Sequence, residues 1–238
     1  MKIDITMTAA LRPKILERTL ASICSNLIWP DGFCLIVDIA PVGDRKYTQD
    51  GVAGIVHSYF ADHKIRMLPE SKQADALKWT WENVDSPYAL QWEDDWVLRS
   101  RIELSSLIHF MNQDTSIGVI AFDRYRKSVL NYPGYEGKFR YIHSGMWERV
   151  KEKSLGGPPA LMRKKYMAEV LTIVDGDICL DVLSNMKSSR ALMKKWGVYV
   201  YTATSGALVE DIGKEWRAKR GLKMVKDTPR GVTWLPIV

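Results

Sequence analysis

Three consecutive acids, Glu93-Asp94-Asp95, follow an apolar run that ends at Trp92. Adjacent carboxylates repel one another, so such a triplet is costly unless a cation or hydrogen-bond donors neutralise it. Hard oxygen ligands of this kind suit Mg²⁺ or Mn²⁺ bridging to a diphosphate. The alternative is a solvated acidic turn, which the flanking Trp92 and Trp96 disfavour. The triplet therefore predicts a site for a cation or for clustered donors.

The elements before the triplet predict a parallel sheet that places it. Residues 3–8 alternate as in a strand, Pro13 is suited to begin a helix, and 33–38 form an apolar strand that ends at Asp38. This strand–helix–strand unit is typical of a parallel sheet, whose carboxyl edge is where open α/β sheets bind ligands.

The remaining pattern predicts one domain, 1–238, with halves 1–122 and 123–238, because no linker or internal repeat interrupts it. The fold class is α/β, a mainly parallel central sheet flanked by helices, with a smaller irregular or antiparallel part over 123–158. Polar residues 41–50 predict a loop. Further helices are expected over 71–84, 101–112, 161–173 and 178–195, and further strands over 88–92, 118–122 and 198–201.

Composition excludes several classes of protein. The 238 residues are 46% hydrophobic and 26% charged, which rules out disorder, collagen and coiled coil. No apolar run is long enough to cross a bilayer, and the first residues lack a signal-peptide pattern. Three scattered cysteines, Cys24, Cys34 and Cys179, are expected to be buried thiols in a reducing compartment. A cytoplasmic location with no membrane partner is expected.

Charge is divided unevenly along the chain. Residues 1–120 hold 12 Lys and Arg against 16 Asp and Glu, a balance of −4, whereas 121–238 hold 22 against 12, a balance of +10. The basic half indicates a polyanionic partner. The alternative is a basic face that only keeps the protein in solution.

The order of these motifs resembles the nucleotide-sugar glycosyltransferases of the GT-A fold, family 2-like, over residues 3–215. The resemblance implies that Thr8, Ala9 and Arg12 cradle the nucleoside of a nucleotide-diphosphate sugar, with a UDP-sugar favoured. Asp38 would face the base. Glu93-Asp94-Asp95 would stand for the D-x-D motif, contacting the ribose and holding Mn²⁺ or Mg²⁺ through Asp95 and Glu93.

Downstream segments continue the resemblance. Gly157, in a small-residue segment before a helix, would lie beside the donor sugar. An aspartate of the 175–181 segment would be the base of an inverting reaction, with Asp177 favoured and Asp181 the alternative. An aspartate there is as readily a helix N-cap. The family often places a late histidine on the metal, and this chain has none after His143.

The 209–217 segment mixes acids, bases and tryptophan. The segment would close over the donor diphosphate with Lys214 or Arg217 as the counter-charge, and Glu210-Asp211 or water could take the place of the late histidine. The alternative is a short amphipathic surface helix with internal ion pairs.

Two function classes remain open. A glycosyltransferase is favoured, with DNA bearing hydroxymethylated bases as a candidate acceptor and a saccharide or small molecule as the alternative. A non-enzymatic nucleic-acid-binding module is the second class, because basic and aromatic residues alternate in 124–127 and 138–141. The acidic first half disfavours a pure nucleic-acid binder. No P-loop, dinucleotide-binding or hydrolase-elbow motif occurs.

Overall fold

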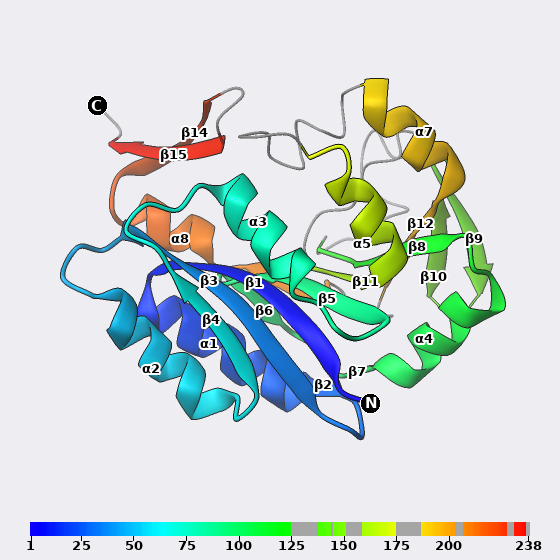
Figure 1. Cartoon of the computed structure of the whole chain (residues 1–238), viewed down its shortest axis with the longest axis horizontal. Helices are drawn as coiled ribbons and strands as arrows, with labels where there is room; N and C mark the ends of the chain where they lie inside the picture. The colour runs from blue at the N-terminus through cyan, green and yellow to red at the C-terminus, as the bar shows by residue number, and fades with distance from the viewer. Residues whose placement is uncertain are drawn as a thin grey trace.

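The computed structural model describes residues 1–124, 138–143, 145–150, 159–174, 187–202, 207–227 and 231–236. Its centre is a nine-stranded sheet (Figure 1). In sheet order the strands are β4 (His63–Met67), β3 (Phe33–Gly43), β1 (Ile3–Leu11), β5 (Tyr88–Glu93), β11 (Ala160–Arg163), β8 (Ile117–Phe122), β12 (Gly197–Tyr201), β10 (Met146–Arg149) and β9 (Phe139–His143).

The sheet is mainly parallel, as predicted. Strands β4, β3, β1 and β5 pair in parallel, and so do β8 and β12. Strand β11 runs antiparallel to both β5 and β8, so that β8 points the same way as β5. Strand β10 runs antiparallel to its neighbours β12 and β9. Seven strands therefore share one direction, and β11 and β10 oppose it.

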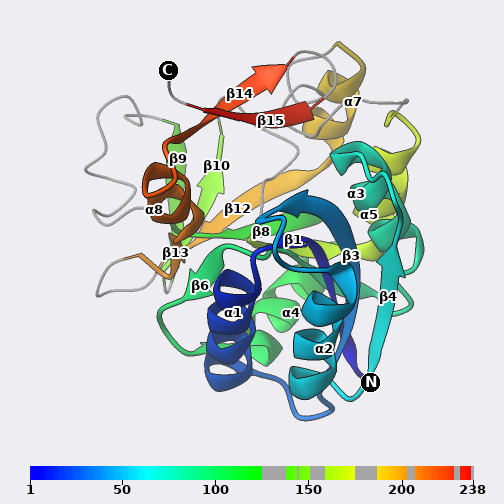
Figure 2. The ribbon, with the colours of Figure 1, turned by 90° about the vertical axis from the view of Figure 1, so that its left-hand side faces the viewer.

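Helices cover both faces of this sheet (Figures 1 and 2). They are α1 (Pro13–Asn26), α2 (Gln49–Tyr59), α3 (Gln73–Glu82), α4 (Leu104–Gln113), α5 (Lys164–Leu171) and α7 (Lys187–Lys195). One core joins the sheet to α1, α2 and α4, and a second joins its other face to α3 and α5. Alternate strand residues enter alternate cores, as Ile36 and Val37 of β3 show.

Helix α1 begins at Pro13, because proline has no N–H to lose at a helix start and its φ is already helical. Its inward face is the run predicted from the spacing, namely Ile15, Leu16, Thr19, Leu20 and Ile23. This burial fixes the turn between β1 and α1 at the carboxyl edge of the sheet.

Three small strand pairs complete the part of the fold that the structure describes. Strand β13 (Val209–Asp211) lies antiparallel to β6 (Trp96–Leu98) and leads into the short helix α8 (Gly213–Ala218). Strand β2 (Leu27–Ile28) pairs with β7 (Ile102–Glu103), and β14 (Leu222–Asp227) pairs with β15 (Gly231–Pro236). Ile15, Val97 and Ile212 form a third apolar cluster with Trp216 against it, which holds α8 beside α1 and β6.

Several local predictions were wrong. Residues 161–163 belong to strand β11 rather than to a helix, because Leu161 and Met162 are buried on opposite faces of the sheet. Strand β3 continues through Gly43 into the predicted loop. Cys24 is exposed and Cys34 partly exposed, so neither is the buried thiol that was expected.

Helix α2 and strand β4 were not predicted. Within the part of the chain that the structure describes, no helix is long and apolar enough to cross a membrane.

Candidate functional site

Four polar residues lie side by side across the carboxyl edge of the parallel strands. Thr8 of β1 is in register with Asp38 of β3 and with Glu93 of β5, and Asp38 is in register with Arg66 of β4. Residues in register point to the same face of a sheet. The sequence predicted Thr8, Asp38 and Glu93 as site residues, and the strand register brings all three into one row.

The row lies on the face of the sheet that α3 covers. Two residues before Thr8 and Glu93, the side chains of Thr6 and Gln91 hydrogen-bond to each other at 2.8 Å, and Trp81 of α3 donates to the same Gln91 oxygen. Helix α3 thus covers the middle of this face, and the row lies closer to the edge where the strands end, with Arg66 in contact with α3.

Asp38 is fully buried and already has two partners. Arg66 Nε donates to its Oδ2, and Ser71 Oγ donates to its Oδ1 at 2.7 Å. The Arg66 guanidinium also lies 4.9 Å from the ring centre of Trp79 and donates to the Asp75 carbonyl at 3.0 Å. Asp38 therefore holds Arg66 against the Trp79 ring. We call this pair at the end of the row the Arg66–Trp79 platform.

Asp94 is the structural centre of the acidic triplet. Arg12 Nε donates to its Oδ2 at 3.2 Å, a second Arg12 nitrogen donates to its Oδ1, and the Ala10 N–H donates to its Oδ2 at 3.0 Å. Thr19 Oγ1 donates to the Asp94 carbonyl at 2.7 Å. Since Arg12 and Asp94 are both buried, their forked ion pair ties the β5–β6 turn to the start of α1.

Asp95 meets two arginines at one oxygen. Its Oδ2 accepts from Arg12 at 3.1 Å and from Arg217 of α8 at 3.4 Å. The backbone of α8 also approaches this carboxylate closely, because a Cβ added at Gly213 would lie 2.0 Å from the same oxygen. The predicted diphosphate counter-charge Arg217 is therefore next to the acidic triplet, although 122 residues separate Arg217 and Asp95 in the chain.

Burial and the neighbouring charges shift the acids of the triplet. Loss of water and the nearby Asp95 raise the pKa of Glu93 to about 8, and burial together with Asp94 raises the pKa of Asp95 to about 6. Burial alone would lower the pKa of Arg12, but Asp94 and Asp95 raise it above its usual range. The raised pKa favours the protonated form of Glu93, and its carboxyl accepts from Trp96 Nε1 at 3.2 Å.

The remaining predicted residues are placed less centrally. Ala9 packs in the apolar core on the opposite face from Thr8. The Lys214 side chain is largely exposed, with Nζ 3.5 Å from Asp211 Oδ2. Asp211 caps α8 by accepting from the Gly213 and Lys214 N–H groups at 2.9 and 3.2 Å. Gly157, Asp177 and Asp181 lie outside the described residues.

The triplet does not fit a divalent cation in this arrangement. Both Asp94 oxygens and the Asp95 Oδ2 accept from guanidinium groups, and Glu93 accepts from Trp96 Nε1. Over the described ranges, no three His, Cys, Asp or Glu side chains are grouped to hold a metal ion. Arginines thus engage three of the four side-chain oxygens of Asp94 and Asp95.

Sequence reasoning missed Arg66, Ser71 and Trp79, and it gave Trp216 no separate role. Arg66 could have been found if β4 had been predicted, because the register of β4 with β3 places Arg66 beside Asp38. Two guanidinium groups lie close to the Trp216 ring centre, that of Arg12 at 5.5 Å and that of Arg220 at 4.2 Å. Periodicity in a six-residue helix could not show this.

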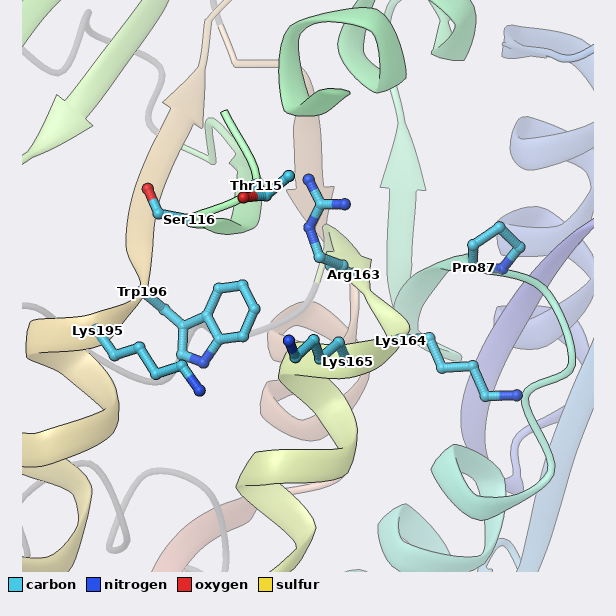
Figure 3. A pocket seen from close by; sticks show the side chains of 8 residues that line it. All are labelled: Pro87, Thr115, Ser116, Arg163, Lys164, Lys165, Lys195 and Trp196. Atoms are coloured by element: carbon cyan, nitrogen blue, oxygen red, sulfur yellow. The ribbon is translucent and has the colours of Figure 1, made fainter. Parts of the chain in front are cut away.

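A basic pocket of about 800 Å³ lies at the other end of β5, where Pro87 leads into the strand (Figure 3). Four cationic side chains line it, Arg163, Lys164, Lys165 and Lys195. Figure 3 shows Lys165 pointing toward Trp196 across the pocket. Arg163 donates to the carbonyl of Ile117 at 3.1 Å, so at least this cation helps to hold the fold together.

Comparison with solved structures decides the type of fold. No protein-family model matches the chain, and no curated protein matches its sequence. Among solved structures, a mannosyltransferase from Pyrobaculum calidifontis in complex with GDP-Man and Mn²⁺ superposes with a TM-score of 0.58 at 14% identity. It is matched over 92% of this chain and 61% of its own length.

Staphylococcus aureus TarS (residues 1–349) gives a similar result. Its complex with UDP superposes with a TM-score of 0.56 at 13% identity, and its complex with UDP-GlcNAc with 0.55 at 13%. Both matches cover 88% of this chain. The chain has a GT-A-like fold. It spans about 60% of the length of these neighbours, whose complexes show what those proteins bind.

Proposed function

We propose that the protein is a glycosyltransferase that moves a sugar from a nucleotide-diphosphate sugar to an acceptor hydroxyl. The observation that carries the proposal is the row Thr8–Asp38–Glu93, continued by Asp94 and Asp95, at the carboxyl edge of a GT-A-like sheet. Solved neighbours of this fold are complexes with UDP, UDP-GlcNAc and GDP-Man, which supports the same donor class here.

The site offers groups suited to each part of such a donor. The Arg66–Trp79 platform and Thr8 would receive the nucleoside, because a flat guanidinium stacked on an indole presents both a surface and donors to a base. Arg217 at the other end would receive the diphosphate. Asp177 is proposed as the base that takes the acceptor proton, with Asp181 as the alternative.

The acceptor proposal rests on charge. The +10 balance of residues 121–238 suits a polyanion, and DNA with hydroxymethylated bases is the proposed acceptor. The β9–β10 hairpin supports this, because Tyr141 is 56% exposed and its ring centre lies 4.9 Å from that of Trp147. Gel shifts with plain and hydroxymethylated DNA at two salt concentrations test it. If DNA does not bind even at the lower salt concentration, a saccharide or a small molecule is left as the acceptor.

The divalent cation predicted at Asp95 and Glu93 is not part of this proposal. The Mn²⁺ in the mannosyltransferase complex favours it, and the engaged carboxylates of this chain disfavour it.

The donor proposal is tested by incubating the protein with a panel of UDP- and GDP-sugars and measuring nucleotide release by mass spectrometry. We expect release from at least one donor, and its loss in Asp95→Asn with an unchanged circular dichroism spectrum. Asp62→Asn is the matched control, because Asp62 is exposed and precedes β4 at the opposite edge of the sheet. Release by Asp95→Asn equal to that of the parent would place the chemistry elsewhere.

A further inference from the structure

Two arginines share Asp95, but they are held differently. The buried Arg12 guanidinium donates hydrogen bonds to both Asp94 side-chain oxygens and to Asp95 Oδ2. Arg217 makes only longer contacts in the described residues, 3.4 Å to Asp95 Oδ2 and 3.8 Å to Asp211 Oδ2. A strong charge-assisted hydrogen bond is about 2.7–2.9 Å long. Arg217 is therefore positioned by two carboxylates without being bound closely by either.

Packing keeps the Arg217 guanidinium at this position. Its side chain is 13% exposed, and the helix that carries it is anchored by Ile212 and Trp216 against Ile15 and Val97. Little water surrounds the charge, so an anion that reached it would interact at a lower effective dielectric than on the surface. The guanidinium also lies beside the acidic triplet, at the end of the Thr8–Asp38–Glu93 row.

The carboxylates around Asp95 already have cationic partners. Asp94 and Asp95 pair with Arg12, Asp95 and Asp211 pair with Arg217, and Asp211 also pairs with Lys214. A divalent ion at Asp95 Oδ2 would have to displace two guanidinium groups from that oxygen. A diphosphate oxygen needs no such displacement, because guanidinium N–H groups donate to phosphate oxygens and the described contacts of Arg217 to its two carboxylates are long.

We infer that Arg217 carries the positive charge that neutralises the leaving diphosphate, so that donor binding does not depend on a divalent cation. This inference rests on the proposed function and names the group that acts on the donor. The bond from the anomeric carbon to the diphosphate oxygen breaks, and its electron pair stays with the nucleoside diphosphate beside Arg217. The acceptor oxygen bonds to the anomeric carbon and gives its proton to a base. Asp95 and Asp211 are positioning residues that aim the guanidinium.

The test measures the Kd of UDP and of GDP by calorimetry on the full chain, once in excess EDTA and once in excess Mn²⁺. We expect at least one nucleotide to bind equally well in both. Arg217→Gln is expected to weaken binding by about tenfold or more, because it removes charge-assisted hydrogen bonds. Arg217→Lys keeps the charge and should recover part of the loss.

Lys219→Gln is the matched control, since Lys219 follows α8, is exposed, and pairs with Glu215 rather than with the site. Its Kd should equal that of the parent. Binding that requires Mn²⁺ and is unchanged in Arg217→Gln overturns the inference and leaves the proposed function standing. Binding in EDTA that is unchanged in Arg217→Gln also overturns it. If neither nucleotide binds in either condition, the proposed function fails and the inference fails with it.

Discussion

Gly213→Ala is the smallest change that disturbs the link between α8 and the acidic triplet. The added Cβ would lie 2.0 Å from Asp95 Oδ2, 2.7 Å from its Cγ and 2.9 Å from its Cβ. The whole carboxylate must therefore move, or α8 must lift away from β6. Overpacking of this kind costs about 1 to 3 kcal/mol. The higher helix propensity of alanine returns at most about 1 kcal/mol.

Urea denaturation followed by circular dichroism measures the change in the free energy of unfolding, and calorimetry measures nucleotide affinity. We expect Gly213→Ala to lose stability and to bind nucleotide about tenfold more weakly, because Asp95 no longer aims Arg217. Gly54→Ala is the matched control, since Gly54 is also helical and no atom lies within 4 Å of its added Cβ. Gly54→Ala should keep affinity and keep or gain stability. A Gly213→Ala variant with the stability and affinity of the parent would refute the close approach of α8 to Asp95.

Three further predictions concern single residues of the site. Arg12→Ala should cost about 3 to 5 kcal/mol in urea denaturation, because Asp94 is left buried without its fork; stability equal to that of the parent would contradict the ion pair. Above the Asp95 pKa of about 6, the folded chain still keeps the Glu93 proton to about pH 8 whereas the unfolded chain has lost it, so stability should fall as pH rises from about 6 to about 8, by at most about 1.4 kcal/mol per pH unit from this group. Glu93→Gln should remove that slope, and an unchanged slope would assign it to other groups. Asp177→Asn should reduce sugar transfer strongly with donor Kd unchanged, and a loss seen with Asp181→Asn alone would move the base to that residue.

The placement of Thr8, Asp38 and Glu93 at one sheet edge followed from sequence, because each ends a predicted strand. The apolar runs before Asp38 and Glu93 and the alternation before Thr8 define three parallel strands, and parallel strands bring their ends to one edge. The helix start at Pro13 then placed Arg12 at that edge as well.

The contacts between distant segments did not follow. No local pattern shows that β13 pairs with β6, and this pairing brings Asp211 and Arg217 to Asp95. Strand β4 was missed because His63, Lys64 and Arg66 make it polar, so the platform at Asp38 was missed with it. Leu161–Arg163 resembled the start of a helix because the helix that follows continues their apolar spacing.

The location of a bound nucleoside diphosphate tests the account most directly. Crystals of the protein soaked with UDP, and others soaked with GDP, should show the diphosphate against Arg217 next to Asp95 and the base against Arg66 and Trp79. Density for the nucleotide in the basic pocket at Lys164 and Lys165, with the carboxyl edge of β1 and β5 empty, would contradict the account.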